Sequence, residues 1–201
     1  MKHSPFTNKL PELYESICGQ FDVSGSVLEI GCGPSKNTLL NLGIFKNSKY
    51  RVGINLKAYD HYDDFEVLEC NANDMSKTFD DSTFEMVLCN VVLEHDKFFW
   101  KSLSEIRRIT KPGGVFILGV PGLVTDLHSC KWVDPRTRKK VRNFNILNAS
   151  LTYRVHNAPG DFWRFTEQAY REVLMEGFHD VKYSSFLMPP IIIGSGVKDS
   201  E

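Results

Sequence analysis

The spacing of hydrophobic positions changes several times along the first 120 residues. Apolar side chains in residues 8–19 recur at intervals of three and four, which predicts an amphipathic helix. Further on, short runs are typical of strands, and the run 115–120 is apolar throughout, as expected for a central parallel strand. These strand runs are 26–30, 50–56, 65–70, 84–89 and 115–120.

Two helices are predicted between the strand runs. Pro34 opens a short helix that stops near Gly43, since proline is favoured in the first helical turn. A longer helix has an apolar face from Phe99 to Ile106, and the Lys-Pro-Gly-Gly sequence at 111–114 stops it. Strands and helices therefore alternate through this part of the chain, which predicts βαβ units and a parallel sheet.

The rest of the chain is organised differently. Residues 121–165 have no regular hydrophobic period. Residues 166–176 are typical of a helix, and 179–187 and 190–194 are typical of two final strands. We expect one domain over residues 1–201, in which 121–165 is an insertion that covers the site, because long connections in compact domains are often functional.

Composition narrows the classes of function. The chain has 201 residues, of which 42% are hydrophobic and 24% charged, as in ordinary packed domains. The formal net charge of −1 gives no general attraction to polyanions, so nucleic acid is disfavoured as a partner. Five cysteines without a CxxC pair are expected to be buried thiols rather than disulfides or a metal site. No apolar stretch resembles a signal peptide or a membrane span, so we expect a cytoplasmic protein without a membrane partner.

Candidate chemistry begins at the turn that follows the first strand run. Gly31 and Gly33 allow a sharp turn and let a ligand approach the backbone closely. Lys36 occupies the position of the third glycine in the dinucleotide pattern, which argues against NAD and an oxidoreductase. Glu29 suits a ligand with a cationic amino-acid end. The alternative is a tight turn that binds no ligand.

Three segments in register resemble one family. The sequence from Val27 to Gly33, Val-Leu-Glu-Ile-Gly-Cys-Gly, resembles the first motif of class I S-adenosylmethionine-dependent methyltransferases, of the methyltransferase type 11-like kind. Residues 84–95 are similar to the family's fourth strand and its loop, and residues 111–114 to the turn before its fifth strand. The resemblance implies an α/β fold: a Rossmann-like, doubly wound, mostly parallel seven-stranded sheet flanked by helices. Residues 161–166 also resemble a bacterial-type subgroup that is linked to sugar or polysaccharide modification.

The resemblance also implies a binding mode for S-adenosyl-L-methionine, with S-adenosyl-L-homocysteine as product. The glycine turn would line the methionine part of the cofactor, Asn55 would accept the ribose hydroxyls, and Asn71 would lie near the adenine. The family usually has a carboxylate at these last two positions, and an amide oxygen accepts hydrogen bonds more weakly. Topology places Asn90 at the ligand edge of the sheet. The expected cofactor-binding residues are Glu29, Gly31, Gly33, Asn55, Asn71, Ala72 and Asn90.

A general base is useful when the methyl acceptor is a hydroxyl, although alignment of the reactants supplies most of the catalysis. The expected catalytic residues are His156, Asp161 and His95. His95 has packing as an alternative role, and the other two have a structural turn.

The sequence favours a small-molecule or glycan-like acceptor that is methylated at oxygen. Asn90 is followed by Val91 and not by Pro-Pro-aromatic, which disfavours the amino-methylating enzymes of DNA bases, and the Pro-Cys nucleophile of cytosine C5 enzymes is missing. One alternative is an RNA or nucleotide methyltransferase that docks through the basic loop 131–142. Another is a catalytically inactive cofactor-binding protein, to which the amides at 55 and 71 point. The sequence does not indicate the oligomeric state.

Overall fold

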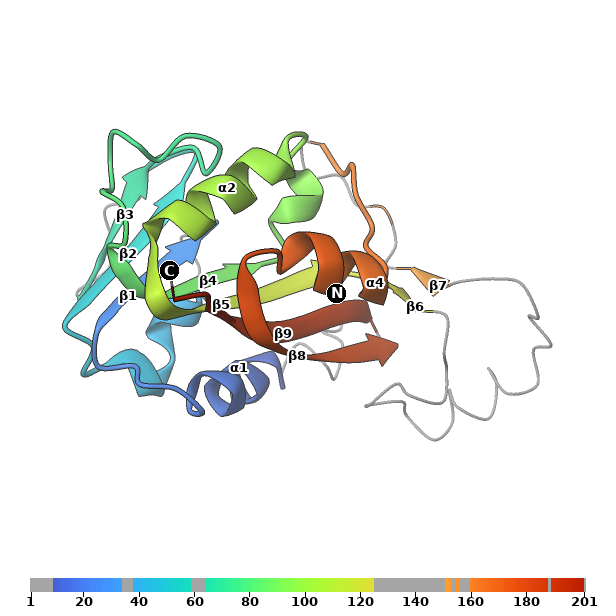
Figure 1. Cartoon of the computed structure of the whole chain (residues 1–201), viewed down its shortest axis with the longest axis horizontal. Coiled ribbons are helices and arrows are strands. Elements are labelled where there is room, and N and C mark those ends of the chain that lie inside the picture. Colours follow the sequence, from blue (N-terminus) through green and yellow to red (C-terminus); the bar gives the residue numbers. More distant parts are fainter. Residues whose placement is uncertain are drawn as a thin grey trace.

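A seven-stranded sheet in the order β3-β2-β1-β4-β5-β9-β8 forms the centre of the computed structural model (Figure 1). Strands β1 to β5 pair in parallel, whereas β9 pairs antiparallel with both β5 and β8. This arrangement confirms the predicted Rossmann-like, mostly parallel sheet. The structure describes residues 9–33, 38–58, 64–124, 151–152, 155, 160–187 and 189–200. The strands are β1 (Ser26–Ile30), β2 (Tyr50–Asn55), β3 (Glu66–Glu69), β4 (Phe84–Asn90), β5 (Thr110–Pro121), β8 (Phe178–Leu187) and β9 (Pro190–Lys198).

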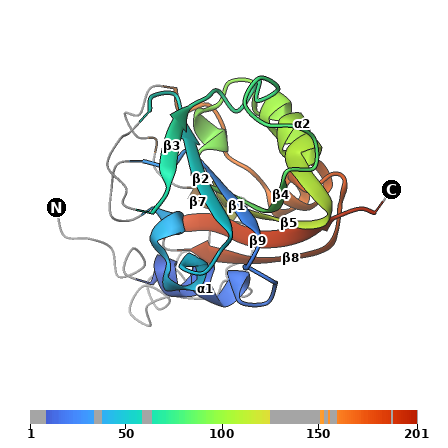
Figure 2. The ribbon, with the colours of Figure 1, turned by 90° about the vertical axis from the view of Figure 1, so that its left-hand side faces the viewer.

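Helices cover both faces of the sheet. Helix α1 (Leu10–Cys18) lies on one face, and α2 (Phe99–Ile109) lies on the other (Figures 1 and 2). A short helix, α4 (Glu167–Ala169), continues as a π-helix over Tyr170–Leu174 on the same face as α2. The sequence therefore located this last helix correctly but did not predict its π-helical turn.

The core consists of two hydrophobic clusters separated by the sheet. Leu28 and Val87 belong to the cluster beneath α2, whereas Val27 and Leu88 belong to the cluster beneath α1. Neighbouring strand residues thus point to opposite faces, and both faces are buried. This double burial explains why the buried stretches of the central strands β4 and β5 are mostly apolar.

The predicted helix between β1 and β2 is wrong in its described part. Residues 34–37 lie outside the described residues, and the chain then forms two 3₁₀ turns, η1 (Leu39–Asn41) and η2 (Gly43–Phe45). Leu42 between them has an extended backbone with ψ of 140°, which breaks any continuous helix. The amide of Leu40 donates to the buried Glu29 carboxylate at 3.0 Å and so replaces a helical hydrogen bond.

Two boundaries near β5 also differ from the sequence-based expectation. β5 starts at Thr110, earlier than predicted, and the pairing register with β4 shifts between Phe84 and Met86. Beyond β5, the two-residue strands β6 (Leu123–Val124) and β7 (Leu151–Thr152) pair antiparallel. Phe165 then returns to the end of β5, where its amide donates to the Pro121 carbonyl at 3.0 Å. The returning segment 160–165 therefore lies at the carboxyl end of the sheet.

Candidate functional site

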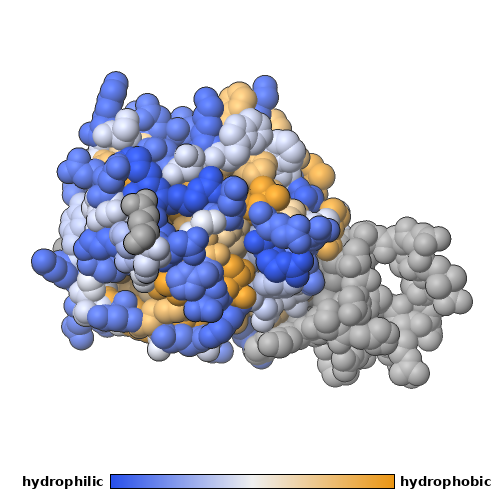
Figure 3. Space-filling view, in the orientation of Figure 1, coloured by the Kyte–Doolittle hydropathy of each residue, from blue (hydrophilic) through white to orange (hydrophobic). Residues whose placement is uncertain are grey.

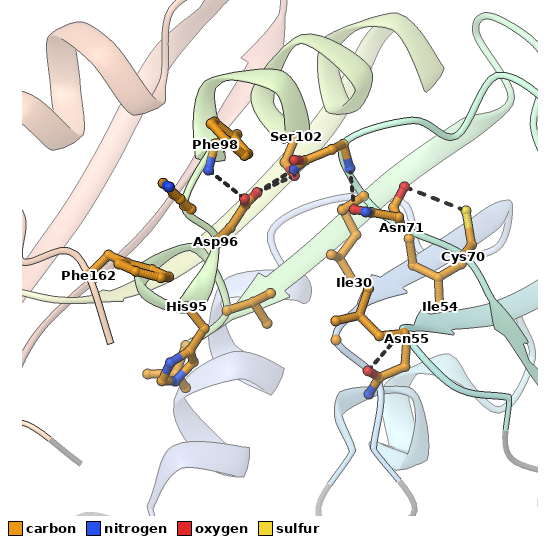
Figure 4. Close-up of a pocket in the computed structure, with 17 residues that line it drawn as sticks. Ile30, Ile54, Asn55, Cys70, Asn71, His95, Asp96, Phe98, Ser102 and Phe162 are labelled. Carbon is orange, nitrogen blue, oxygen red and sulfur yellow. Dashed lines mark hydrogen bonds between the residues drawn. The ribbon is translucent and has the colours of Figure 1, made fainter. Parts of the chain in front are cut away.

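A pocket of about 480 Å³ opens where strands β1 to β4 end (Figure 4). The parallel strands all present their carboxyl ends here, which is the usual ligand edge of this kind of sheet. Asn55 and Asn71 lie on one side of the pocket, and His95 and Phe162 lie on the other. The lining also includes Gly31 and Ala72, together with Ile30, Ile54, Leu56, Cys70, Asn73, Val91, Val92, Asp96, Lys97, Phe98 and Ser102.

The glycine turn after β1 forms the floor of the pocket. Gly31 has φ of +78°, and a Cβ atom there would lie 2.3 Å from Cγ2 of Val92. Only glycine fits this position, because the left-handed conformation and the contact both exclude a side chain. At Gly33, a Cβ atom would meet nothing within 4 Å, so the backbone at this position is open to close approach. The pocket lining includes Gly31 and not Gly33.

Asn55 joins the end of β2 to the glycine turn. Its Nδ2 donates to the Cys32 carbonyl at 2.9 Å, and its Oδ1 accepts from the Leu56 amide at 2.7 Å. Because the nitrogen is engaged by a carbonyl, the amide orientation is fixed, and Oδ1 keeps a second lone pair for a ligand hydroxyl. Leu56 is 70% exposed and gives the pocket an apolar surface beside this amide.

The loop after β3 is held by polar contacts. Asn71 Oδ1 accepts from the Asn73 amide at 3.0 Å. Asn73 Nδ2 in turn donates to Asp96 Oδ2 at 2.6 Å and to Ser102 Oγ at 2.8 Å. These hydrogen bonds connect the loop to the first part of α2 and the residues just before it. They hold in place the part of the pocket wall that Ala72 forms. Sequence reasoning missed Asn73 and Asp96, because this network joins segments that are distant along the chain.

Glu29 and Asn90 point toward the face of the sheet that α1 covers, and neither is among the lining residues of the pocket. Glu29 Oε2 accepts from the Leu40 amide and from the Thr38 hydroxyl, and burial raises the pKa of this carboxyl. Its observed contacts thus shape the loop after the glycine turn. Asn90 Oδ1 accepts from the Tyr14 hydroxyl at 2.8 Å.

His95 lies in the pocket wall, on turn η3 (Leu93–His95) after β4. Its Nδ1 is 2.7 Å from the Gly160 carbonyl oxygen, and its Nε2 is 3.7 Å from Glu94 Oε1. A carbonyl can only accept, so we assign the proton to Nδ1. In this tautomer Nε2 is the nitrogen that can take up a proton.

The other two expected catalytic residues are placed differently. His156 lies outside the described residues. Asp161 has a side chain that is only 4% exposed, and both of its oxygens are bound by the Arg164 guanidinium, one of them at 2.7 Å. The structure therefore does not bring Asp161 into the pocket lining. Its neighbour Phe162 does line the pocket, and the Phe162 amide donates to the Glu94 carbonyl at 2.8 Å.

Glu94 is a buried acid that the sequence did not reveal. Its side chain is fully buried, and neither carboxylate oxygen has a hydrogen-bond partner in the described part of the chain. Burial raises the pKa of the Glu94 carboxyl to about 7. The charge of Arg164 lowers this pKa, and the charge of Asp161 raises it. No sequence pattern would have found this group, because one glutamate in a short turn has no periodicity.

Aromatic side chains gather at the rim of the pocket. Phe98 and Phe162 line it and are 42% and 51% exposed. Lys97 and Lys101 place their Nζ atoms 5.5 and 5.3 Å from the centre of the Phe98 ring. These exposed rings offer flat apolar surface at the entrance. On the face of the molecule shown in Figure 3, hydrophilic residues dominate and hydrophobic areas are smaller.

Over the residues that the structure describes, no group of three or more histidine, cysteine, aspartate or glutamate side chains could hold a metal ion. The helices of the same residues include none that is long and apolar enough to cross a membrane. Cys18, Cys32, Cys70 and Cys89 are free and buried thiols.

Sequence comparison identifies two kinds of relative. The methyltransferase domain family matches residues 28–118. An uncharacterised protein of Methanocaldococcus jannaschii is 36% identical over 101 residues, which make up 50% of this chain and 44% of that protein. The chain thus covers less than half of that relative.

Solved structures share the fold at low sequence identity. A proposed methyltransferase of Bacillus halodurans has a TM-score of 0.63 at 14% identity, with 96% of this chain and 100% of that chain covered. Haemonchus contortus phosphoethanolamine N-methyltransferase 2, solved with phosphomonomethylethanolamine and S-adenosylhomocysteine, has a TM-score of 0.62 at 13% identity, with 96% and 53% covered. Burkholderia thailandensis 1,6-didemethyltoxoflavin-N1-methyltransferase, solved with 1,6-didemethyltoxoflavin and S-adenosylhomocysteine, has a TM-score of 0.57 at 13% identity, with 98% and 79% covered.

At such identities the structural likeness establishes the fold alone, and the family rests on the matched sequence. The match extends from β1 to β5 and includes the glycine turn and the loop after β4. Residues 28–118 thus match a methyltransferase domain, and the fold is that of the class I S-adenosylmethionine-dependent methyltransferases.

Proposed function

We propose that this chain transfers a methyl group from S-adenosylmethionine to an oxygen atom of a small-molecule or glycan-like acceptor. The observation that carries the proposal is the pocket at the ends of β1 to β4, which joins a glycine turn to oriented amide groups. The pocket is large enough for a ligand of this class, at about 480 Å³.

The residues of the pocket fit the cofactor in chemistry. Gly31 and Gly33 would take its methionine part, because a Cβ atom is excluded at the first and the backbone is open at the second. Asn55 Oδ1 would accept the ribose hydroxyls, and Asn71 with Ala72 would border the adenine. We also assign Glu29 and Asn90 to the cofactor site. Glu29 would act indirectly, through the hydrogen bonds by which it holds the loop after the glycine turn. When bound, the cofactor supplies a methyl group that is activated by a sulfonium.

His95 is our first candidate for the base that removes the acceptor's proton. It lines the pocket, and its Nδ1 is fixed by the Gly160 carbonyl, so that Nε2 is the basic atom. Glu94 Oε1 lies 3.7 Å from Nε2 and, when ionised, would stabilise the imidazolium once the proton has been taken up. His156 is the second candidate. Asp161 would act by holding Arg164, since the guanidinium already binds both of its oxygens.

The aromatic rim supports a ring-shaped acceptor. The exposed faces of Phe98 and Phe162 would stack on a sugar or a planar ring as it enters. The two N-methyltransferases among the structural neighbours methylate nitrogen, so transfer to nitrogen is the alternative that must be tested directly.

Two measurements test the proposal. Calorimetry should show binding of S-adenosylmethionine and S-adenosylhomocysteine but not of NAD. Transfer of a labelled methyl group should then be measured to matched pairs of phenols, sugars and their amine counterparts. Binding of NAD in place of S-adenosylhomocysteine, or methylation of the amines alone, would overturn the proposal.

A further inference from the structure

Tyr14 of α1 reaches through the core to the site end of β4. The residue is fully buried, and its hydroxyl donates to Asn90 Oδ1 at 2.8 Å. Gly119, which pairs with Asn90 across β4 and β5, makes room for this bond. A Cβ atom at Gly119 would lie 2.4 Å from the Tyr14 hydroxyl and 2.5 Å from Asn90 Oδ1. Three distant segments therefore combine to fix one side-chain amide.

The burial of Tyr14 decides which end of the amide faces it. Asn90 is the hydrogen-bond partner of the Tyr14 hydroxyl, and the structure places no other described residue in that role. If Asn90 turned its nitrogen inward, the hydroxyl would accept, and its own proton would be buried without an acceptor. An unsatisfied buried donor is costly, so Oδ1 faces Tyr14. The nitrogen of Asn90 then points away and has no partner among the described residues.

We propose that Tyr14 is a positioning residue that makes Asn90 a donor-only group, which binds an oxygen of the ligand. The oxygen is either the methionine carboxylate of the cofactor or an oxygen of the methyl acceptor. This proposal rests on the assignment of Asn90 to the site in the proposed function. Without Tyr14 the amide would turn freely and present its own oxygen for part of the time, which repels a ligand oxygen.

Calorimetry with Tyr14→Phe tests the proposal. The probes are S-adenosylhomocysteine and 5′-methylthioadenosine, which lacks the amino-acid end. Tyr14→Phe should weaken S-adenosylhomocysteine binding by about two- to tenfold, the worth of one hydrogen bond, and leave methylthioadenosine unchanged. Asn90→Asp should weaken it further, because the carboxylate still accepts from Tyr14 but presents a second oxygen to the ligand.

Tyr170→Phe is the matched control. Tyr170 is also fully buried, and its hydroxyl donates to the Leu118 carbonyl at 2.8 Å, away from Asn90. This variant should lose a similar amount of thermal stability and keep both ligand affinities. An equal loss of S-adenosylhomocysteine affinity in both tyrosine variants would reduce Tyr14 to a general structural role and overturn the proposal.

The remaining outcomes separate the two possible ligand oxygens. Unchanged S-adenosylhomocysteine affinity in Tyr14→Phe and Asn90→Asp, with a raised acceptor KM at unaltered kcat, would assign the bond to the acceptor. No change in either measurement would refute the proposal, as would a wild-type protein that does not bind S-adenosylhomocysteine. Methylation of nitrogen by the wild type would refute only the proposed acceptor, since the calorimetry contains none.

Discussion

Replacement of Glu94 by glutamine should stabilise the protein in a pH-dependent manner. Glu94 is fully buried without a hydrogen-bond partner among the described residues, and burial raises the pKa of its carboxyl to about 7. In the unfolded chain the same carboxyl titrates near its ordinary value of 4.5. Between these two values the folded protein holds a proton that the unfolded chain has released, so the free energy of unfolding falls as the pH rises.

The size of the effect follows from the distance between the two pKa values. A pKa moved from 4.5 to about 7 corresponds to roughly 3 kcal/mol of stability. Below pH 4.5 the glutamic acid and the glutamine are both neutral, and Glu94→Gln should match the wild type. Above pH 7 the wild type bears the full cost of a buried charge, and the variant should be more stable by up to about 3 kcal/mol.

Urea unfolding at several pH values from 4.5 to 8 measures the difference between variant and wild type. Glu105→Gln is the control of opposite sign, since hydrogen bonds from Arg108 hold the pKa of the Glu105 carboxyl below its usual range. Over this pH range that variant should be less stable than the wild type by a nearly constant amount, because the lowered pKa keeps the Glu105 carboxylate ionised throughout. A Glu94→Gln difference that stays constant with pH would refute the reasoning, because it would mean that Arg164 or another group already compensates the Glu94 charge.

Three further substitutions test the pocket. Gly31→Val should abolish S-adenosylhomocysteine binding in calorimetry, because a side chain there would lie within 2.3 Å of Val92; unaltered affinity would contradict the assigned floor. Asn55→Asp should weaken S-adenosylhomocysteine binding, since it replaces the 2.9 Å hydrogen bond to the Cys32 carbonyl with a repulsion between oxygens; tighter binding would show that charge at the ribose outweighs this contact. His95→Ala should lower kcat by about 10²-fold or more while cofactor affinity is kept, and an unchanged kcat would leave His95 a packing role.

The strands and the glycine turn could be predicted from the sequence because their signals are local. Residues 84–89 are apolar except for Glu85, since both faces of the sheet are covered, and this run forms β4. Gly31 could be predicted because a positive φ leaves few other choices of residue. The helix expected from Pro34 onward failed for the opposite reason. The conformation of its described part depends on the buried Glu29 carboxylate of β1, which accepts a hydrogen bond from the Leu40 amide in place of a helical carbonyl.

The sequence could not predict which end of the Asn55 and Asn90 amides is left for a ligand, since the residues that orient these amides lie far away in the chain. For Asn55, the sequence alone predicts that aspartate would bind the ribose more tightly. The contact with Cys32, which lies 23 positions away, reverses the expected sign. Tyr14 and Asn90 are 76 positions apart, and no periodicity links them.

The three amides at the ends of β2, β3 and β4 share a property that neither sequence nor family resemblance reveals. Each has one end engaged by the protein itself: Asn55 by the Cys32 carbonyl, Asn71 by a backbone amide two residues on, and Asn90 by Tyr14. An amide that is oriented in advance loses little further freedom when it binds a ligand. It also presents either a defined donor or a defined acceptor to the ligand, whereas an ionised carboxylate can only accept. An amide that the protein orients in this way therefore costs less ligand affinity than an amide that is free to turn. The loss of S-adenosylhomocysteine affinity in Tyr14→Phe measures how much the prior orientation of Asn90 contributes.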